Sequence, residues 1–373
     1  MDKISIRSTL ILLILAVLSV ACFIIVEMTK VDKEQDWYNE KMEAAHLTQK
    51  ANEHIRAIHY GDAEILDNIN DPNETGLIGE EFTSITTGEG SLPIKLSTTN
   101  PNFAAMVVQL IKDAELEKGD NVAVCMTGSF PGLNIATLAA IQTLELNPVI
   151  ICSVTSSGWG ATNPEFTWLD MQNELNKANL ITAKSVAASI GGNQDIGMAL
   201  SNEGRQKVID AINRNNVNFI NNDSLPLNIA ERLKYINDFS KGKPIKLFIN
   251  IGGGTASIGS DANGNAVPSG LNQDIMLKDI PNKQGVLFEM AKSRIPIIHL
   301  LNLEGLMKIY DLPRNPVPLP EVGTGKLFIH KKYNLPVVII STLSLISLII
   351  AVAYQDKKRH ELGTEIVKDD QQV

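Results

Sequence analysis

The sequence predicts an α/β protein in which one water-soluble domain lies between two terminal transmembrane helices. Two observations support this prediction. A charge-free apolar run of about 20 residues, long enough to cross a bilayer, lies near each end of the chain. Between the runs, short and nearly continuous apolar stretches alternate with helical patterns, which is typical of a mostly parallel sheet covered on both faces. The expected sheet is Rossmann-like and doubly wound.

The two apolar runs occupy residues 8–26 and 335–354, and a polar tail follows at 355–373. A cleaved signal peptide is the alternative for the first run, but its apolar core is too long and no small-residue cleavage site precedes Glu27. A lipoprotein anchor at Cys22 is disfavoured because the apolar run continues past it. Both runs are therefore predicted to be transmembrane helices.

Basic residues near the two ends bear on orientation. Lys3 and Arg7 precede the first run, and residues 357–359 follow the second. Positive flanks favour the cytoplasm, which would place the middle domain on the other side of the membrane. Lys331 and Lys332 on the opposite flank weaken this contrast.

Composition narrows the class of function. The chain has 373 residues and a net charge of −9, with 33 Lys and Arg against 42 Asp and Glu, so a general binder of nucleic acid or anionic lipid is not expected. Its 3 cysteines are too few for a disulfide framework. The sequence contains no Cys/His/Asp cluster with metal-ligand spacing, so we predict no metal site and no cofactor.

The segment 27–100 is predicted to be a juxtamembrane helix followed by connecting chain. Apolar residues recur at helical spacing over 32–60, and Asp71-Pro72 ends this pattern. Residues 76–101 are rich in Gly, Ser and Thr and are expected to connect the helix to the α/β domain.

The α/β domain is predicted to span residues 101–325. Helices are expected at 101–117, 133–146, 165–178, 203–214 and 226–239. Strands are expected at 121–126, 148–154, 185–190, 217–220, 245–251 and 296–301, and a hairpin turn at 261–265. The first, second, fifth and sixth of these strands should be neighbours in one sheet.

Open α/β sheets bind ligands outside the carboxyl edge of their strands. Four loops are expected to meet there, at 127–134, 153–163, 252–257 and 299–304. These loops contain the residues that we expect at a site.

In the first loop, Thr127, Gly128, Ser129 and Asn134 lie between a strand and a helix. Backbone N–H groups at a helix N-terminus bind anions well, so these residues are candidate ligand contacts. Ser129 is also a candidate nucleophile, although its spacing to the flanking glycines is not that of a nucleophile elbow. A plain turn with Ser129 as the helix N-cap is the third alternative.

The second loop contains Ser157, Trp159 and Asn163, and such aromatic, hydroxyl and amide groups suit a sugar, amide or peptide-like ligand. A Trp159 side chain folded over the core as a lid is the alternative.

The third loop is Gly252, Gly253, Gly254 and Thr255, where glycines let the backbone approach a ligand closely. A nucleotide-binding loop of the actin-like ATPases would carry an acidic residue where Asn250 stands, which argues against that alternative.

His299 lies near the carboxyl end of the last predicted strand. It is expected to be either a satisfied core or rim histidine or a general base that faces Ser129 and is oriented by Asp170. Ser129, His299 and Asp170 are therefore the candidate catalytic residues.

Three stretches carry a family resemblance. They are residues 127–136 (TGSFPGLNIA), 157–171 (SGWGATNPEFTWLDM) and 71–79 (DPNETGLIG). Together with the two apolar runs, they resemble the poly-gamma-glutamate system protein family over nearly the whole chain. The resemblance implies a two-pass accessory protein of the bacterial cell membrane, in bacteria that make a poly-gamma-glutamate polymer or capsule. Its implied partners are the polymer synthase complex, namely a cytosolic ATP-dependent ligase and a small membrane subunit.

The resemblance indicates a pathway but no chemical step, so three functions stay open. The first is an assembly or export subunit whose α/β domain binds an anionic polymer end or a related peptide-like ligand. The second is a hydrolase or transferase that uses Ser129 to cut or attach the polymer. The third is an envelope scaffold. The sequence favours the first, with binding through local backbone N–H groups because an acidic domain repels a polyanion overall.

Overall fold

The computed structural model describes residues 9–61, 69–275, 280 and 283–369. The chain divides into two compact units. Unit 1 consists of Met1–Glu34 and Ile329–Val373, and unit 2 consists of Gln35–Phe328.

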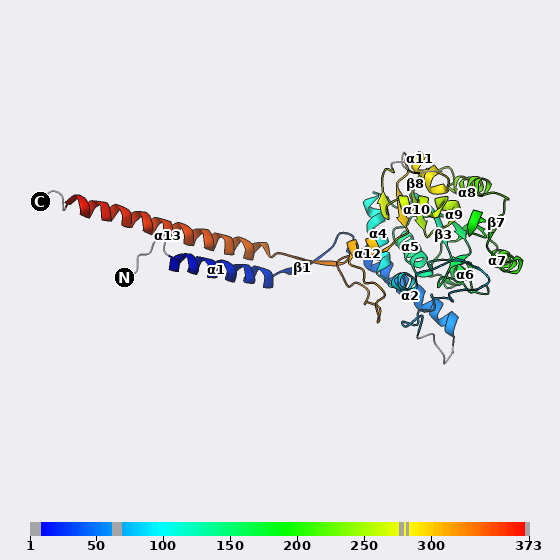
Figure 1. Ribbon diagram of the computed structural model, residues 1–373, viewed down its shortest axis with the longest axis horizontal. Helices are drawn as coiled ribbons and strands as arrows, with labels where there is room; N and C mark the ends of the chain where they lie inside the picture. Colours follow the sequence, from blue (N-terminus) through cyan, green and yellow to red (C-terminus); the bar gives the residue numbers. More distant parts are fainter. Residues whose placement is uncertain (1–8, 62–68, 276–279, 281–282, 370–373) are drawn as a thin grey trace. The chain divides into compact units, whose positions relative to one another are not determined.

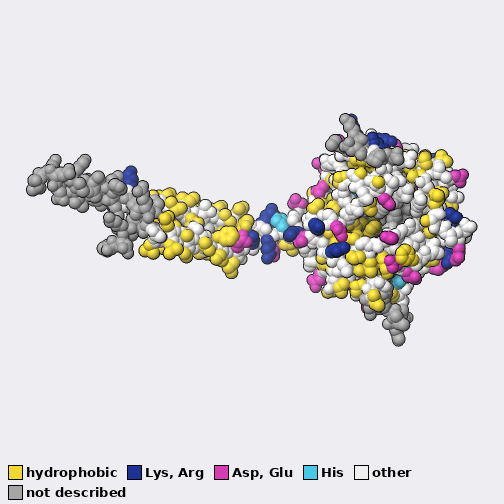
Figure 2. Space-filling view, in the orientation of Figure 1, with side chains coloured by type: hydrophobic (Ala, Val, Ile, Leu, Met, Phe, Trp, Pro, Cys, Tyr) yellow, Lys and Arg dark blue, Asp and Glu magenta, His cyan; other side chains and the backbone are white. Residues whose placement is uncertain are grey.

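Unit 1 contains the two long apolar helices. Helix α1 spans Thr9–Met28 and α13 spans Leu335–Asp369. Over Thr9–Met28 and Leu335–Gln355 these helices are long and apolar enough to cross a membrane, with mean hydropathies of 3.2 and 2.6. Apolar side chains cover their described surface (Figure 2), as the two predicted spans require.

An antiparallel ribbon joins the two helices of unit 1. Strand β1, Val31–Glu34, pairs with β11, Ile329–Lys332, with Val31 opposite Lys332. The Tyr333 hydroxyl donates to Glu27 Oε1 at 2.8 Å, which ties the ends of the two helices together. The predicted helical pattern from residue 32 is therefore wrong at its start, because residues 31–34 pair as a strand.

A sheet forms the centre of unit 2, with helices packed around it (Figure 1). Its seven strands run in the order β7-β6-β4-β3-β8-β10-β9. All neighbouring pairs are parallel except β9–β10. The strands are β3 Asn121–Thr127, β4 Asn147–Ser153, β6 Ser185–Ser189, β7 Asn218–Ile220, β8 Ile245–Ile251, β9 Gly270–Asn272 and β10 Ile297–Leu300. The four strands expected to be neighbours are neighbours, which confirms the mostly parallel α/β sheet.

Helices and short elements complete unit 2. The helices are α2 Tyr38–Tyr60, α3 Leu92–Ser97, α4 Phe103–Asp113, α5 Pro131–Thr143, α6 Trp168–Lys177, α7 Asn202–Arg214, α8 Leu225–Phe239, α9 Thr255–Ile258, α10 Asp261–Ala266, α11 Val286–Lys292 and α12 Glu304–Tyr310. A 3-10 turn, η1, covers Asn193–Asp195. Strands β2, Thr86–Gly88, and β5, Ser156–Ser157, form a separate parallel pair.

Both faces of the sheet are buried at its central strands, which are therefore mostly apolar. Val122, Val124 and Met126 of β3 pack in one cluster with residues of α4, α5 and α6. Ala123 and Cys125 of the same strand pack in a second cluster with residues of α8 and α11. Alternate side chains of a strand point to opposite faces, which accounts for the two clusters.

Two sequence predictions for unit 2 need correction. Residues 261–265, predicted to form a hairpin turn, belong to α10, because the Ser260 side chain accepts from the Asn263 N–H at 3.2 Å and caps the helix. The predicted connecting chain contains α3, which begins at Leu92 with Pro93 in its first turn.

Candidate functional site

A cavity of about 1160 Å³ lies at the carboxyl edge of the parallel strands of unit 2. Residues that follow β3, β4, β6, β8 and β10 line it, and the segment between β2 and α3 adds a further wall. The cavity therefore lies at the edge where open α/β sheets bind ligands.

Six of the predicted site residues line this cavity: Thr127, Ser129, Ser157, Gly253, Gly254 and Thr255. The other predicted ligand contacts, Gly128, Asn134, Trp159, Asn163 and Gly252, are not among its lining residues, and nor are Asp170 and His299.

Asn134 and the two glycines outside the lining shape the ends of the strands. Asn134 is fully buried, and its Nδ2 donates to the Thr127 carbonyl at 2.8 Å, which fixes the end of β3. A Cβ on Gly128 would lie 2.6 Å from the Val154 carbonyl oxygen. Gly252 has a φ of 84°, and a Cβ there would lie 2.6 Å from Thr127 Oγ1. These positions therefore require glycine for backbone geometry and close approach.

Trp159 and Asn163 make local contacts in the second loop. The Trp159 N–H donates to the Glu80 carbonyl at 3.1 Å, and its side chain is half-buried. Asn163 Oδ1 accepts from the Glu165 N–H at 2.9 Å ahead of α6. Both contacts lie outside the cavity lining.

Lys95 of α3 brings a buried amine to the cavity. The residue is only 2% exposed, and its Nζ lies 2.8 Å from Ser157 Oγ. Nζ also donates to the Ser129 carbonyl and lies 4.3 Å from the centre of the Phe130 ring. Burial lowers the pKa of Lys95 to about 7, because a charged amine loses its hydration there.

Ser157 and Ser129 are held together by a backbone contact. The Ser157 N–H donates to Ser129 Oγ at 3.0 Å. Strand β5 positions Ser157 by pairing with β2, and the Gly158 N–H donates to the Gly88 carbonyl at 2.9 Å. The Ser157 side chain is half-buried and lines the cavity.

The Lys95–Ser157 contact has the geometry of a base beside a nucleophile. A general base must lie within about 2.6–3.2 Å of the group whose proton it takes, with a pKa near the working pH. The Nζ–Oγ distance of 2.8 Å and the lowered pKa of Lys95 meet both conditions. Serine–lysine pairs are an established variant of the serine–histidine arrangement.

His299 is a fully buried core residue of β10. Its Nε2 lies 3.1 Å from the Gly264 carbonyl and donates to it, and its Nδ1 lies 3.1 Å from Asn250 Nδ2 and accepts from it. This assignment follows from the partners, since a carbonyl can only accept. Burial lowers the pKa of His299, so the imidazole is neutral at neutral pH.

Asp170 is the third residue of α6 and closes a capping box with Thr167. Its carboxylate also accepts from Arg214 Nε at 2.8 Å, Arg214 Nη2 at 2.6 Å and Asn215 Nδ2 at 2.7 Å. Over the described part of the chain, no hydrogen bond joins Asp170, His299 and the Ser129 hydroxyl.

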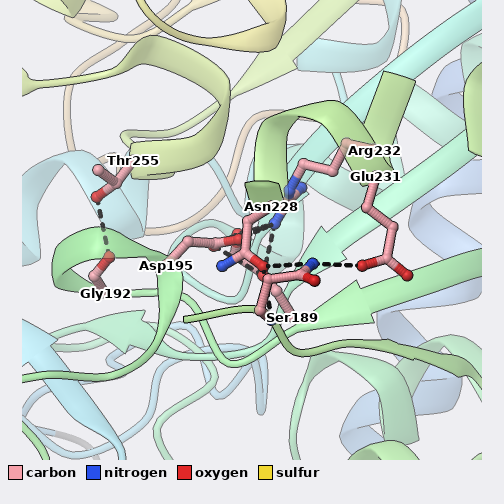
Figure 3. Close-up of polar contacts among 9 residues, drawn as sticks. Ser189, Gly192, Asp195, Asn228, Glu231, Arg232 and Thr255 are labelled. Atoms are coloured by element: carbon pink, nitrogen blue, oxygen red, sulfur yellow. Dashed lines mark hydrogen bonds and ion pairs between the residues drawn. The ribbon is translucent and has the colours of Figure 1, made fainter. Parts of the chain in front are cut away.

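A buried ion pair between Arg232 and Asp195 (Figure 3) lies at the ends of β4 and β6, where it contacts Ser153 and Ser189. Arg232 Nη2 of α8 lies 3.1 Å from each carboxylate oxygen of Asp195, and the two side chains are 1% and 0% exposed. The same Nη2 donates to Ser153 Oγ at 2.9 Å and to Ser189 Oγ at 2.5 Å. Ser153 lines the cavity, so this network reaches the site.

Charges around the cavity are mostly acidic. Glu89, Asp261 and Glu304 are exposed lining residues, and Lys95 is the one basic lining residue that the described chain contributes. This balance does not favour a polyanion over the whole cavity. Among the described residues, no group of three or more His, Cys, Asp and Glu side chains could hold a metal ion.

Sequence reasoning did not identify Lys95, although a signal was present. It is the only charged residue between Glu89 and Lys112, and it follows the helix-start signal at Pro93. The absence of neighbouring charges distinguishes Lys95 from the lysines of the charged surface segments.

The chain was compared with protein families, curated proteins and solved structures. No protein-family model, curated protein or solved structure matches this chain.

Proposed function

We propose that this chain is a membrane-anchored serine hydrolase or acyl transferase, with Ser157 as the nucleophile and Lys95 as the general base. The observation that carries the proposal is the distance of 2.8 Å between Lys95 Nζ and Ser157 Oγ at a cavity wall. A pKa near 7 leaves a substantial fraction of the amine neutral and able to accept a proton at neutral pH.

The proposed reaction has two halves. Neutral Lys95 accepts the Ser157 hydroxyl proton while Oγ forms a bond to the carbonyl carbon of an amide or ester. The Lys95 ammonium then gives this proton to the leaving nitrogen or oxygen as its bond to carbon breaks, which leaves an acyl group on Ser157. Water or an amine attacks the acyl carbon, Lys95 takes its proton, and Ser157 regains a proton as it leaves.

Ser129 is a positioning residue in this scheme. Its carbonyl accepts from Lys95 Nζ, and its hydroxyl accepts from the Ser157 N–H at 3.0 Å. These two contacts hold the base and the nucleophile in one geometry, which favours reaction because less motion has to be frozen in the transition state.

The fold proposed for unit 2 is Rossmann-like and doubly wound. The support is the strand order, in which β4, β6 and β7 lie on one side of β3 and β8 and β10 lie on the other. Such an order places a topological switch point between β3 and β8. Thr127 and Gly253, which follow these strands, both line the cavity.

The proposed setting is the bacterial cell membrane, with both chain ends in the cytoplasm and unit 2 outside. Two helices long enough to cross a membrane and the basic flanks support it. A reporter fused after Lys326 should be active outside the cytoplasm, and cytosolic fluorescence of this fusion would contradict the orientation.

The proposed substrate is an end of poly-gamma-glutamate or its attachment point, because the acidic lining does not favour a longer stretch of this polyanion. The proposed partner is the polymer synthase complex. The sequence resemblance supports this choice, and the amide links of such a polymer suit the serine–lysine chemistry. In polymer-producing cells, Ser157→Ala should change the polymer's length distribution, while Ser91→Ala, at an exposed serine of the same cavity, should not.

A non-catalytic assembly or export subunit is the second candidate. The observation that favours it is the size of the cavity, about 1160 Å³, with exposed backbone at Gly253. Such a site could hold a polymer end without chemistry. It predicts that Ser157→Ala leaves polymer length and yield unchanged.

The test of the chemistry uses an alkyl fluorophosphonate, which labels activated serines without knowledge of the substrate. The full chain in detergent should be labelled on Ser157, at a rate that rises with pH with a midpoint at about 7. Lys95→Met should reduce the rate by about 10² or more, and Ser91→Ala should leave it unchanged. Labelling at another residue, or a rate independent of Lys95, would reject the serine–lysine assignment.

A further inference from the structure

We infer that the turn formed by Gly192, Asn193, Gln194 and Asp195, called here the 192–195 turn, recognises the amide groups of a peptide-like chain. Its role as a specificity element rests on the proposed function, because it lines the same cavity as Ser157. The inference starts from the backbone of the turn.

The 192–195 turn contains two consecutive non-glycine residues in the left-handed region. Gln194 has a φ of 57° and Asp195 a φ of 63°. A side chain with a Cβ adopts this region at a conformational cost, because Cβ approaches the following carbonyl oxygen. Conformations of this kind persist where surrounding structure enforces them, and they gather at functional sites.

The structure that enforces this conformation is the buried ion pair (Figure 3). Asp195 is fully buried and is bound by Arg232, Ser153 and Ser189, so it pins one end of the turn. Thr255 Oγ1 donates to the Gly192 carbonyl at 2.9 Å and holds the other end against the loop after β8. The turn is therefore fixed at both ends.

Between these anchors, Asn193 and Gln194 are exposed and line the cavity. Each carboxamide offers a donor and an acceptor, which is the pattern that a peptide amide complements. The charge of Asp195 is paired with Arg232. The turn thus presents neutral amide groups in the same cavity as Ser157, whose other polar lining residues include Glu89, Asp261 and Glu304.

Binding is tested with fluorescein-labelled tetraglycine amide, which presents backbone amides without side chains, by fluorescence anisotropy on the full chain in detergent. An oligoethylene glycol of similar length, carrying the same dye, controls for binding without amides. The wild-type chain should bind the tetraglycine and not the glycol. Gln194→Gly should weaken tetraglycine binding about threefold to tenfold, as expected for one lost hydrogen bond.

Glu115→Gly is the matched control. Glu115 has a φ of 58°, is exposed and lies outside the cavity lining. Both substitutions relieve a left-handed residue, so both should keep or raise the melting temperature, and only Gln194→Gly should lose affinity. Unchanged affinity in Gln194→Gly, no tetraglycine binding by the wild type, or equal binding of the glycol would overturn the inference.

Fluorophosphonate labelling of the same variants separates the two proposals. Binding that depends on Gln194, without labelling of Ser157, would reject the proposed chemistry and retain amide recognition. Labelling of Ser157, together with a tetraglycine affinity that does not depend on Gln194, would retain the proposed chemistry and reject amide recognition by the turn.

Discussion

Lys95→Met should make the fold more stable at neutral and acidic pH while it removes the proposed base. Burial holds the pKa of Lys95 at about 7 instead of 10.5. This difference corresponds to ~5 kcal/mol of destabilisation when the amine is charged. Methionine fills a similar volume without a charge, so this destabilisation disappears in the variant.

The sign of the pH dependence follows from proton binding. Between about pH 7 and 10.5 the unfolded chain holds a proton on Lys95 that the folded chain has lost. Wild-type stability should therefore rise with pH in this window, by up to ~1.4 kcal/mol per pH unit from this group. Below about pH 7 both states are protonated, and the destabilisation is complete.

The hydrogen bonds that Lys95→Met removes oppose this gain in stability. Lys95→Met leaves the Ser129 carbonyl and Ser157 Oγ without the amine, at a cost of ~1–3 kcal/mol. The expected net gain is ~2–4 kcal/mol below pH 7. Near pH 10.5 only the cost remains, so the variant should be the less stable protein there, and the two stability curves should cross.

Urea unfolding of the full chain in detergent, followed by tryptophan fluorescence to which the buried Trp168 contributes, measures this difference in the free energy of unfolding at each pH. Lys241→Met, at an exposed lysine, controls for the loss of a lysine as such. If the difference in the free energy of unfolding between wild type and Lys95→Met stays constant from pH 6 to pH 10, the inference that Lys95 is a buried amine with a lowered pKa is refuted.

Three further predictions concern buried or capping groups. Asp170→Asn should lower the free energy of unfolding by ~2–3 kcal/mol at pH 7. Burial alone would raise the pKa of Asp170, but bonds from Arg214, Asn215 and Thr167 outweigh it and lower the pKa, so in urea titrations the wild-type advantage should fade as pH falls below about 4. Asp195→Asn should cost ~3–5 kcal/mol because it leaves the Arg232 charge buried and unpaired, and an unchanged urea midpoint would contradict this. The pKa of His299 is lowered by burial, so wild-type stability should fall as pH drops through about 6.5, and His299→Gln should flatten this fall.

The sheet could be predicted from the sequence because the apolar pattern of each central strand is local. The central strands are buried on both faces, so runs such as 245–251 are mostly apolar without reference to any partner. The rule that parallel strands end at one edge then placed Ser129, Ser157 and Gly253 in one cavity before any contact was known.

The side chains that contact the site residues could not be predicted in this way, because they lie far from them in the sequence. Lys95 reaches Ser157 across 62 positions, and Asp170 meets Arg214 across 44. The helix that carries Lys95 is only 6 residues long, too short for a periodic pattern. His299 has two ring nitrogens that either catalysis or packing could use, and only the positions of Asn250 and Gly264 show which use applies.

The start and the end of unit 2 lie beside each other. The Gln35 N–H donates to the Phe328 carbonyl at 2.8 Å, and Gln35 Nε2 donates to the Lys326 carbonyl at 2.9 Å. The chain thus enters and leaves unit 2 at one place, where Gln35 is hydrogen-bonded to Lys326 and Phe328. Residues 35–328 could therefore be transferred as one unit between a different pair of flanking segments. The only geometric requirement is that the two new flanking segments end side by side.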